Sequence, residues 1–283
     1  MNTYIFLLPL YNDWESFSIL SKDINIQMKN MNKTAEILIV NDFSTQNPPV
    51  FKPLSNIKYI NILNLKKNLG SQKAISIGLK YLKEKNKSMI ITILDSDGED
   101  DVSKISLMIS QAEKRTETVI VSSRTKRQEI FMFKILYSIH KLLTFIFTFK
   151  WMSFGNFCSF HSSQLDKILS NDSSWLAFSS SIAKNCIIEK MEAERKKRII
   201  GTSKISFLRL VFHSLRVNSV FFFRSFLLSL LYIFVLYLLY LKGYQWSLYL
   251  VSFIIFYNVA LFLTIFFNVQ KKFFSSLDYL KKN

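Results

Sequence analysis

Two long apolar stretches near the end of the chain limit its fold more than any other feature. They read NSVFFFRSFLLSLLYIFVLYLLYL over 218–241 and WSLYLVSFIIFYNVALFLTIFFNV over 246–269, with KGYQ between them. Each stretch is long enough to cross a bilayer as a helix, which takes about 20 residues. We therefore expect two transmembrane helices within 218–269. A pair of buried helices in a soluble protein is the alternative.

The charges around these stretches predict their orientation. The chain has 37 basic and 20 acidic residues, a formal charge of +17, and no acid occurs from 195 to 277. Two spans joined by a tight turn leave both flanks on one side, and flanks rich in Lys and Arg face the cytoplasm. We expect a multi-pass protein of the cytoplasmic membrane with both termini in the cytoplasm, a basic juxtamembrane segment over 206–217 and a basic tail over 270–283.

The excess of positive charge also suits a polyanionic partner. Because the charge gathers around the spans and no recognition motif accompanies it, nucleic acid is not the expected partner. The membrane surface and a nucleotide are the remaining candidates.

Short apolar runs alternate with helical patterns through the first 125 residues. The runs are rich in Ile and Val, and they cover 4–10, 35–42, 57–63, 88–95 and 117–123. Helical patterns fall at roughly 14–30, 71–86 and 102–115. This alternation is typical of an α/β domain with a mainly parallel, Rossmann-like sheet, which binds ligands at the carboxyl ends of its strands. We expect this α/β domain to span 1–205 and to lie in the cytoplasm.

The segment 131–152 is predicted to be an amphipathic helix in the membrane interface. Its polar side chains recur every three or four positions among apolar ones, at Lys134, Ser138, Lys141, Thr144 and Thr148. A narrow polar stripe of this kind suits a helix that lies along the bilayer surface. A helix packed internally on the sheet is the alternative.

Acids crowd the end of the fourth apolar run, which reads IITILDSDGEDD over 90–101. Asp95 and Asp97 have D-x-D spacing, and Gly98 permits a tight bend. Two such carboxylates could hold a hard divalent cation, Mg²⁺ or Mn²⁺, that also binds a diphosphate, with Glu99 as a further ligand. The alternative is a solvated loop in which Asp100 or Asp101 caps the following helix.

Four motifs together resemble the nucleotide-sugar-dependent glycosyltransferases of family 2, which have a GT-A fold. The usual patterns of that family are V-P-x-Y-N-E, V-D-D-G-S, N-x-G-x-x-x-A-x-x-x-G and D-x-D. The matching residues, in order, are Pro9, Tyr11, Asn12 and Asp13; Asn41, Asp42 and Ser44; Asn68, Gly70, Ala74 and Gly78; Asp95 and Asp97. The resemblance covers residues 5 to about 125.

The resemblance implies roles for these residues. Those that would line the nucleotide are Pro9, Tyr11, Asn12, Asp13, Asp42, Asn68 and Gly70. Asp95 and Asp97 would be catalytic, holding with Glu99 the metal that offsets charge on the departing nucleoside diphosphate. Asn41 replaces the first acid of the D-D pair, Phe43 replaces its glycine, and Asp13 is shorter than the usual Glu. These departures leave open which base the donor carries, so it could be a UDP-sugar or a GDP-sugar.

The second half of the chain is similar to the polyprenyl-phosphate subgroup, which includes dolichol-phosphate mannosyltransferases. That subgroup has an S-R-x-x-R-like segment before its interfacial helices and an R-x-x-R-x-x-G-x-S-K-like segment before its spans. The residues that would bind the acceptor phosphate are Arg124, Arg127, Arg195, Arg198, Ser203 and Lys204. A lipid monophosphate is already anionic, so it needs cations and no general base. Ordinary positive-inside flanking is the other interpretation.

We therefore expect an inverting, metal-dependent enzyme that transfers a sugar from a UDP- or GDP-sugar to a polyprenyl phosphate at the cytoplasmic membrane face. A separate flippase would move the product, and a homo-oligomer is left open. The subgroup usually has G-D-F-R-L where this chain has G-N-F-C-S, so Asn156 replaces an Asp. This change keeps two alternatives open: transfer to a glycan hydroxyl, and an inactive scaffold in a polysaccharide assembly system.

Overall fold

The computed structural model describes residues 2–124, 131–200, 207–268 and 276–281. The chain divides into two compact units. The first holds Met1–Gln128, Ser153–Lys204 and Phe273–Asn283, and the second holds Glu129–Met152 and Ile205–Lys272.

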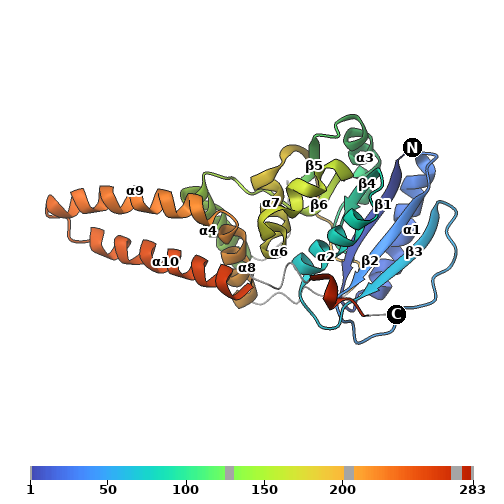
Figure 1. Cartoon of the computed structure of the whole chain (residues 1–283), viewed down its shortest axis with the longest axis horizontal. Helices are drawn as coiled ribbons and strands as arrows, with labels where there is room; N and C mark the ends of the chain where they lie inside the picture. The colour runs from blue at the N-terminus through green and yellow to red at the C-terminus, as the bar shows by residue number, and fades with distance from the viewer. Residues whose placement is uncertain (1, 125–130, 201–206, 269–275, 282–283) are drawn as a thin grey trace. The chain divides into compact units, whose positions relative to one another are not determined.

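The described part of the first unit is built on one sheet with the strand order β3-β2-β1-β4-β6-β5-β7 (Figure 1). The strands are β1 Thr3–Leu10, β2 Ala35–Asn41, β3 Ile57–Asn64, β4 Met89–Ile93, β5 Thr118–Arg124, β6 Phe154–His161 and β7 Ile187–Ala193. Strands β1 to β4 are parallel, whereas β6 runs antiparallel to β4 and β5. The mainly parallel sheet predicted from the sequence is confirmed, and the pattern had not predicted β6 and β7.

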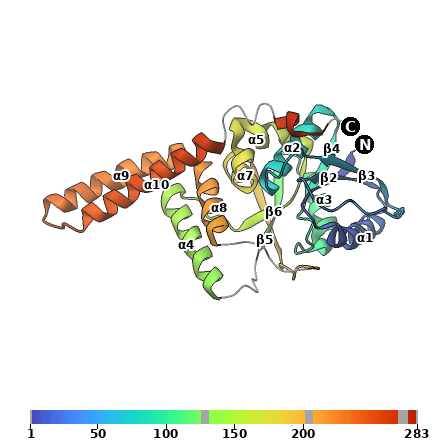
Figure 2. The ribbon, with the colours of Figure 1, turned by 90° about the horizontal axis from the view of Figure 1, so that it is seen from below.

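Helices cover both faces of this sheet (Figure 2). They are α1 Trp14–Asn30, α2 Ser71–Glu84, α3 Ile105–Lys114, α5 Leu165–Leu169, α6 Ser173–Leu176 and α7 Phe178–Asn185. Helices α1 and α3 share a core with one face of β1, whereas α2 packs on the other face. Because both faces are covered, β1 and β4 read as continuous apolar runs without alternation.

Gly78 lets α2 approach the sheet closely. A Cβ added at this position would lie 2.5 Å from Leu7 Cδ1 and 2.9 Å from Val40 Cγ2. Those distances are below any ordinary carbon–carbon contact. The last glycine of the third motif therefore allows close packing between helix and sheet.

Residues near the C-terminus return to the first unit. The backbone N–H of Lys66 donates to Tyr279 O at 2.8 Å, and that of Lys281 donates to Asn64 O at 2.8 Å. Leu280 forms an antiparallel bridge with Leu65. Part of the segment that the sequence marked only as a basic tail thus pairs with the chain at the end of β3.

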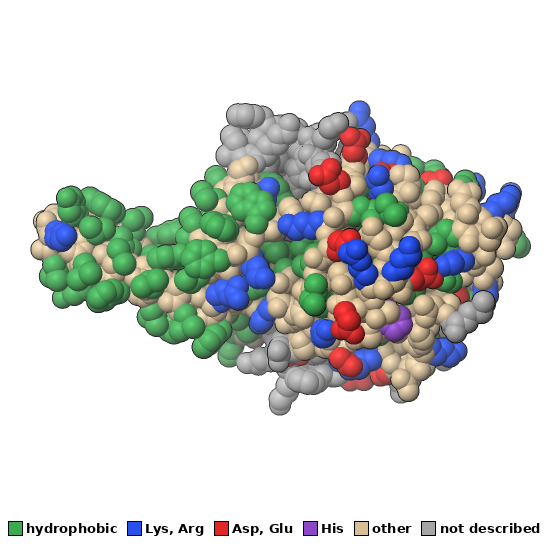
Figure 3. Space-filling model, turned by 90° about the horizontal axis from the view of Figure 1, so that it is seen from above, with side chains coloured by type: hydrophobic (Ala, Val, Ile, Leu, Met, Phe, Trp, Pro, Cys, Tyr) green, Lys and Arg blue, Asp and Glu red, His purple; other side chains and the backbone are tan. Residues whose placement is uncertain are grey.

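The second unit consists, in its described part, of α4 Phe131–Thr148, α8 Phe207–Ser219, α9 Phe222–Leu241 and α10 Ser247–Asn268. Helices α9 and α10 run side by side, as Figures 1 and 2 both show, and Asn258 Nδ2 donates to Ser229 Oγ at 2.7 Å between them. Both are long and apolar enough to cross a membrane, and only 11% and 17% of their apolar windows are buried. Hydrophobic side chains cover their surface (Figure 3). That exposure is unlike the buried helices of a soluble core.

Helix α4 packs with these helices in the second unit, whereas the sequence grouped 131–152 with the catalytic domain. Tyr232 OH donates to Ile146 O at 2.7 Å, and the Phe147 and Tyr257 rings lie 4.3 Å apart. The polar stripe turns partly inward, because Thr144 and Thr148 are fully buried. Several apolar side chains of the segment are exposed instead: Ile139, Leu142, Phe145, Phe149 and Trp151.

Candidate active site

The loops that follow β1, β2 and β4 meet at the carboxyl edge of the sheet, as parallel strands require. Pro9 is buried in β1 opposite Val40, and Tyr11, just beyond the strand, is exposed. Asn12 has a φ of 53°, and its side-chain oxygen accepts from the backbone N–H groups of Thr45 and Gln46 at 2.9 and 3.3 Å. Asn12 therefore ties the loop after β1 to the loop after β2.

Asp42 anchors the loop that leads into α2. Its carboxylate accepts from the backbone N–H of Leu69 at 2.6 Å and from that of Gly70 at 2.8 Å. Asn68 Nδ2 donates to Asp42 O at 3.2 Å. Burial raises the pKa of Asp42, although the hydrogen bonds from the two backbone N–H groups act to lower it. Three residues predicted to line the nucleotide, Asp42, Asn68 and Gly70, are thus brought together at the start of α2.

The two departures in the second motif have structural counterparts. Asn41 Nδ2 donates to Asn64 Oδ1 at 2.8 Å, and Asn41 Oδ1 accepts from Ser44 N at 3.0 Å. A carboxylate could accept from Ser44 but could not donate to Asn64. Phe43 has a φ of 65°, in the left-handed region where glycine is favoured, which explains why that family position usually holds glycine.

The acid loop, residues 95–101, follows β4. Asp100 Oδ2 accepts from Asp95 N at 3.1 Å, and Asp97 Oδ1 accepts from Glu99 N at 3.1 Å. Asp101 caps the short helix Val102–Lys104 by accepting from Ser103 N at 3.2 Å, as the sequence had left open. Asp101 therefore has a local structural role as a helix cap.

The basic segment, residues 195–199, lies along this acid loop. Its backbone N–H groups at Lys196 and Ile199 donate to Glu99 O at 2.8 Å and to Asp97 O at 3.2 Å. Arg195 forms an ion pair with Glu99, and Lys196 Nζ lies 3.2 Å from Asp101 Oδ1. An added Cβ on Gly98, whose φ is 75°, would overlap the Ile199 side chain, so glycine is needed there.

Arg198 connects two of the predicted motifs across the site. Its guanidinium donates to Asp13 Oδ1, and its Nη1 lies 3.9 Å from Asp97 Oδ2. Its Nε also donates to Ile200 O at 2.9 Å. The proximity of Asp13, and of Asp97 and Glu99, raises the pKa of Arg198 against the effect of burial.

The structure thus places Arg195 and Arg198 beside the acids, whereas the sequence pattern assigned both residues to an acceptor phosphate. Arg124 is the last residue of β5. Arg127, Ser203 and Lys204 lie outside the described residues.

The surroundings of Asp97 disfavour the charged form of its carboxyl group. Burial, followed by the negative charges of Asp95 and Glu99, raises the pKa of Asp97 to about 7. A carboxylate in such surroundings gains from a nearby cation, and oxygen ligands are those that Mg²⁺ and Mn²⁺ prefer. The donor set therefore fits a hard divalent cation.

The acids do not form a complete metal cage by themselves. Within the described ranges, no three His, Cys, Asp or Glu residues gather closely enough to hold a metal ion. Glu99 faces Arg195. A cation at Asp95 and Asp97 would therefore take its other oxygen ligands from a diphosphate or from water.

The raised pKa of Asp97 predicts how the stability of the metal-free protein depends on pH. Because its pKa is about 7 in the fold against an ordinary 3.8, the folded state binds the proton more tightly. The free energy of unfolding should then fall as pH rises from about 4 to 7, by on the order of 3 kcal/mol from this group. Denaturation in EDTA at pH 5 and pH 8 measures the change. Asp97→Asn should make the free energy of unfolding less dependent on pH. If the pH dependence of this variant is as steep as that of the wild type, another group is responsible for it.

Asn156 touches the acid loop from β6. Its Nδ2 donates to Asp95 Oδ1 at 3.0 Å, and its Oδ1 accepts from Gln72 Nε2 at 3.0 Å. The sequence marked Asn156 only as a departure and missed Gln72. No local pattern could have found Gln72, because it occupies an unspecified position of the third motif.

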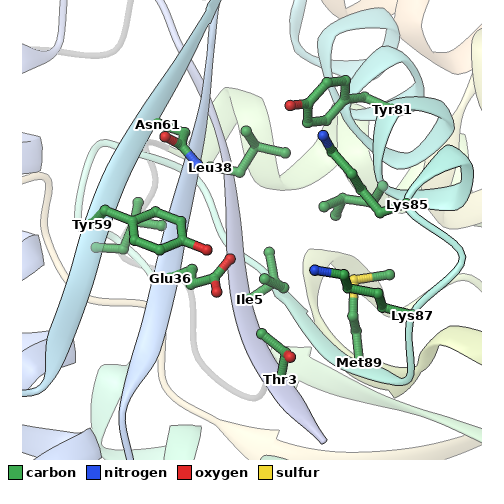
Figure 4. Close-up of a pocket in the computed structure, with 12 residues that line it drawn as sticks. Thr3, Ile5, Glu36, Leu38, Tyr59, Asn61, Tyr81, Lys85, Lys87 and Met89 are labelled. Carbon is green, nitrogen blue, oxygen red and sulfur yellow. The ribbon is translucent and has the colours of Figure 1, made fainter.

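A cavity lies at the opposite, amino end of the strands. This cavity of about 160 Å³ is lined by Thr3, Glu36, Tyr59, Lys85 and Met89, among others (Figure 4). A hydrogen bond with Glu36 raises the pKa of Tyr59 to about 12. This cavity shares no residue with the acid loop or with the predicted motifs.

Comparison with known proteins identifies the motif-bearing region. Residues 6–170 match the family model described as Glycosyl transferase family 2. No curated protein sequence matches the chain.

Solved structures of other proteins are similar to this chain. Glucosyl-3-phosphoglycerate synthase from Mycobacterium tuberculosis, in complex with Mn²⁺, UDP-glucose and phosphoglyceric acid, has a TM-score of 0.57 at 10% identity. That match covers 79% of this chain and 80% of the synthase. S. aureus TarS 1–349 in complex with UDP-GlcNAc has a TM-score of 0.48 at 15% identity; the match covers 78% of this chain and 66% of the TarS chain, less than two thirds of it. The likeness to the synthase shows a GT-A fold.

Proposed function

This chain belongs to glycosyl transferase family 2, and on that premise we propose that it transfers a sugar from a nucleotide-sugar to a polyprenyl phosphate at the cytoplasmic face of a membrane. The observation that carries the proposal is the pairing of the acid loop with the basic segment. Acids suited to a metal–diphosphate and guanidinium groups suited to a second phosphate stand side by side, with Arg198 Nη1 3.9 Å from Asp97 Oδ2.

The donor would bind along the carboxyl edge. The loops held by Asn12 and Asp42 would receive the base and ribose, and the exposed Tyr11 ring lies in the same region of the sheet edge. The mycobacterial synthase that shares the fold is described with UDP-glucose and Mn²⁺, which supports a UDP-sugar and a divalent cation here. Asp95 and Asp97 would hold Mg²⁺ or Mn²⁺, with Glu99 a further candidate. Bound there, the cation would supply positive charge against the leaving diphosphate.

The acceptor phosphate would attack without a general base. Its anionic oxygen forms a bond to the anomeric carbon, while the bond from that carbon to the diphosphate oxygen breaks, which inverts the configuration. Arg195 and Arg198 can donate to phosphate once the acids beside them have another cation. Arg124, Arg127, Ser203 and Lys204 complete the proposed acceptor set.

The apolar helices support a lipid acceptor. Helices α9 and α10 would hold the enzyme in the bilayer to which a polyprenyl phosphate is confined, and the exposed apolar side chains of α4 would face lipid. Both flanks are rich in Lys and Arg, which supports a cytoplasmic site. Two helices offer no route for the product, so a separate flippase would export it.

Sugar transfer to a lipid phosphate tests the proposal directly. Purified full-length protein is incubated with polyprenyl phosphate, Mn²⁺ and a panel of labelled UDP- and GDP-sugars, and lipid-linked label is measured. We expect a glycosyl-phospholipid from a UDP-sugar. Transfer only to a glycan hydroxyl would replace the proposed acceptor. Binding of nucleotide-sugar without turnover on any acceptor would indicate a scaffold.

A further inference from the structure

Asn156 stands at the end of a chain of amide hydrogen bonds that leads to Asp95. The backbone N–H of Phe178 donates to Gln72 Oε1 at 2.7 Å, and Gln72 Nε2 donates to Asn156 Oδ1 at 3.0 Å. Asn156 Nδ2 then donates to Asp95 Oδ1 at 3.0 Å. Three elements, α7, α2 and β6, contribute one member each, so the chain depends on the assembled fold.

The direction of this chain is determined at its first member. A backbone N–H can only donate, so Gln72 must present its oxygen to Phe178 and its NH₂ group to Asn156. Asn156 must then present its oxygen to Gln72 and its NH₂ group to Asp95. Each amide has a single orientation that satisfies both neighbours, and the last donor always points at the carboxylate.

We call this chain of hydrogen bonds from Phe178 through Gln72 and Asn156 to Asp95 the relay, and its members lie on well-anchored elements. Gln72 is the second residue of α2, and the start of that helix is held by the bonds from Leu69 and Gly70 to Asp42. Asn156 lies in β6, which pairs with β4 immediately before the acid loop. A donor mounted on these elements can hold one Asp95 oxygen in place and leave the other oxygen available.

We propose that Asn156 is a positioning residue that orients Asp95 toward the diphosphate-bound cation, and that Gln72 sets the orientation of Asn156. This inference rests on the proposed function. It gives the departure at 156 a reason: an Asp there would have no hydrogen to donate and would place another carboxylate against Asp95. Groups that orient metal ligands in this way are worth about 10- to 100-fold in metal affinity.

Gln72→Glu tests the relay because it changes a residue that does not touch the acids. The new carboxylate still accepts from Phe178 but cannot donate to Asn156, whose amide should then turn its oxygen toward Asp95. We expect the dissociation constant for Mn²⁺, measured with UDP by the EPR signal of free Mn²⁺, to rise about tenfold. Simple charge attraction predicts the opposite sign, since an added negative charge should tighten the binding of a cation.

Asn156→Ala and Gln27→Glu complete the experiment. Asn156→Ala should weaken Mn²⁺ binding at least as much as Gln72→Glu. Gln27→Glu makes the same change in α1, where the side chain accepts from Ser106 at 2.9 Å, and it should leave Mn²⁺ binding unchanged. Melting temperatures show whether each variant is folded.

The outcomes separate the relay from the proposed function. Mn²⁺ binding as tight as in the wild type in both Gln72→Glu and Asn156→Ala would overturn the relay. Because binding is measured without acceptor or turnover, an inactive wild type whose Mn²⁺ binding follows this pattern would overturn the proposed transfer and support the relay.

Discussion

Asp97→Asn is expected to reduce sugar transfer by about 1000-fold or more, because the amide removes a negative charge where the cation and the diphosphate would meet. The same substitution should make the metal-free protein more stable near pH 8. In the wild type, burial and the charges of Asp95 and Glu99 disfavour the ionised Asp97, and the amide relieves that repulsion. Activity and stability should thus change in opposite directions, which a misfolded variant cannot do.

Asp101→Asn is the matched control for this prediction. It makes the same change in the same loop, and an Asn can still accept from Ser103 as the helix cap. Initial rates with labelled donor and the midpoint of thermal unfolding are measured for both variants. We expect Asp101→Asn to keep activity within about threefold, since the helix cap is retained and Lys196, the partner in the lost ion pair, is about half exposed. Full activity in Asp97→Asn would remove the basis of the proposed mechanism.

Arg198→Ala is expected to reduce kcat/KM by about 100-fold, because truncating one partner of a partly buried charge cluster leaves the others without compensation. Two interpretations of Arg198 lead to different kinetics. If its guanidinium holds the acceptor phosphate, the loss should fall mainly on the KM for polyprenyl phosphate. If its guanidinium only offsets the negative charges of Asp13 and Asp97, the loss should fall on the KM for the nucleotide-sugar. Added Mn²⁺ should then restore the thermal stability of the variant.

The proposed acceptor role predicts the first pattern. Arg198→Lys should recover part of the activity, because an ammonium keeps the charge but not the paired donors of a guanidinium. Arg115→Ala is the control: Arg115 pairs with Glu189 at an exposed position away from the acid loop, and its loss should change neither KM. A purely donor-side effect in Arg198→Ala would remove Arg198 from the acceptor set.

Several features of the fold could be predicted because they are written locally in the chain. The strands β1 to β5 are short apolar runs between polar turns, and parallel strands necessarily bring the ends of β1, β2 and β4 to one edge. The acid loop was predicted at that edge for this reason. The two apolar helices were equally clear, since their length and composition alone suit a bilayer.

Other features depend on contacts between residues that are far apart in sequence. Arg198 meets Asp13 only because the segment after β7 crosses the carboxyl edge, and a pattern of basic residues cannot tell a carboxylate partner from a phosphate. The polar stripe of 131–152 suggested a helix with its polar side in water, but Thr144 and Thr148 are buried because α4 packs with other helices of the second unit.

The sequence by itself determined the kind of sheet, the edge that carries the acids and the two apolar helices, because hydrophobic periodicity and motif spacing act over a few residues. Only the tertiary structure decided which charges neutralise the acid loop and which amide faces Asp95. Those choices depend on hydrogen bonds whose partners, such as Asn156 and Asp95, come into contact only when distant segments of the chain have packed together.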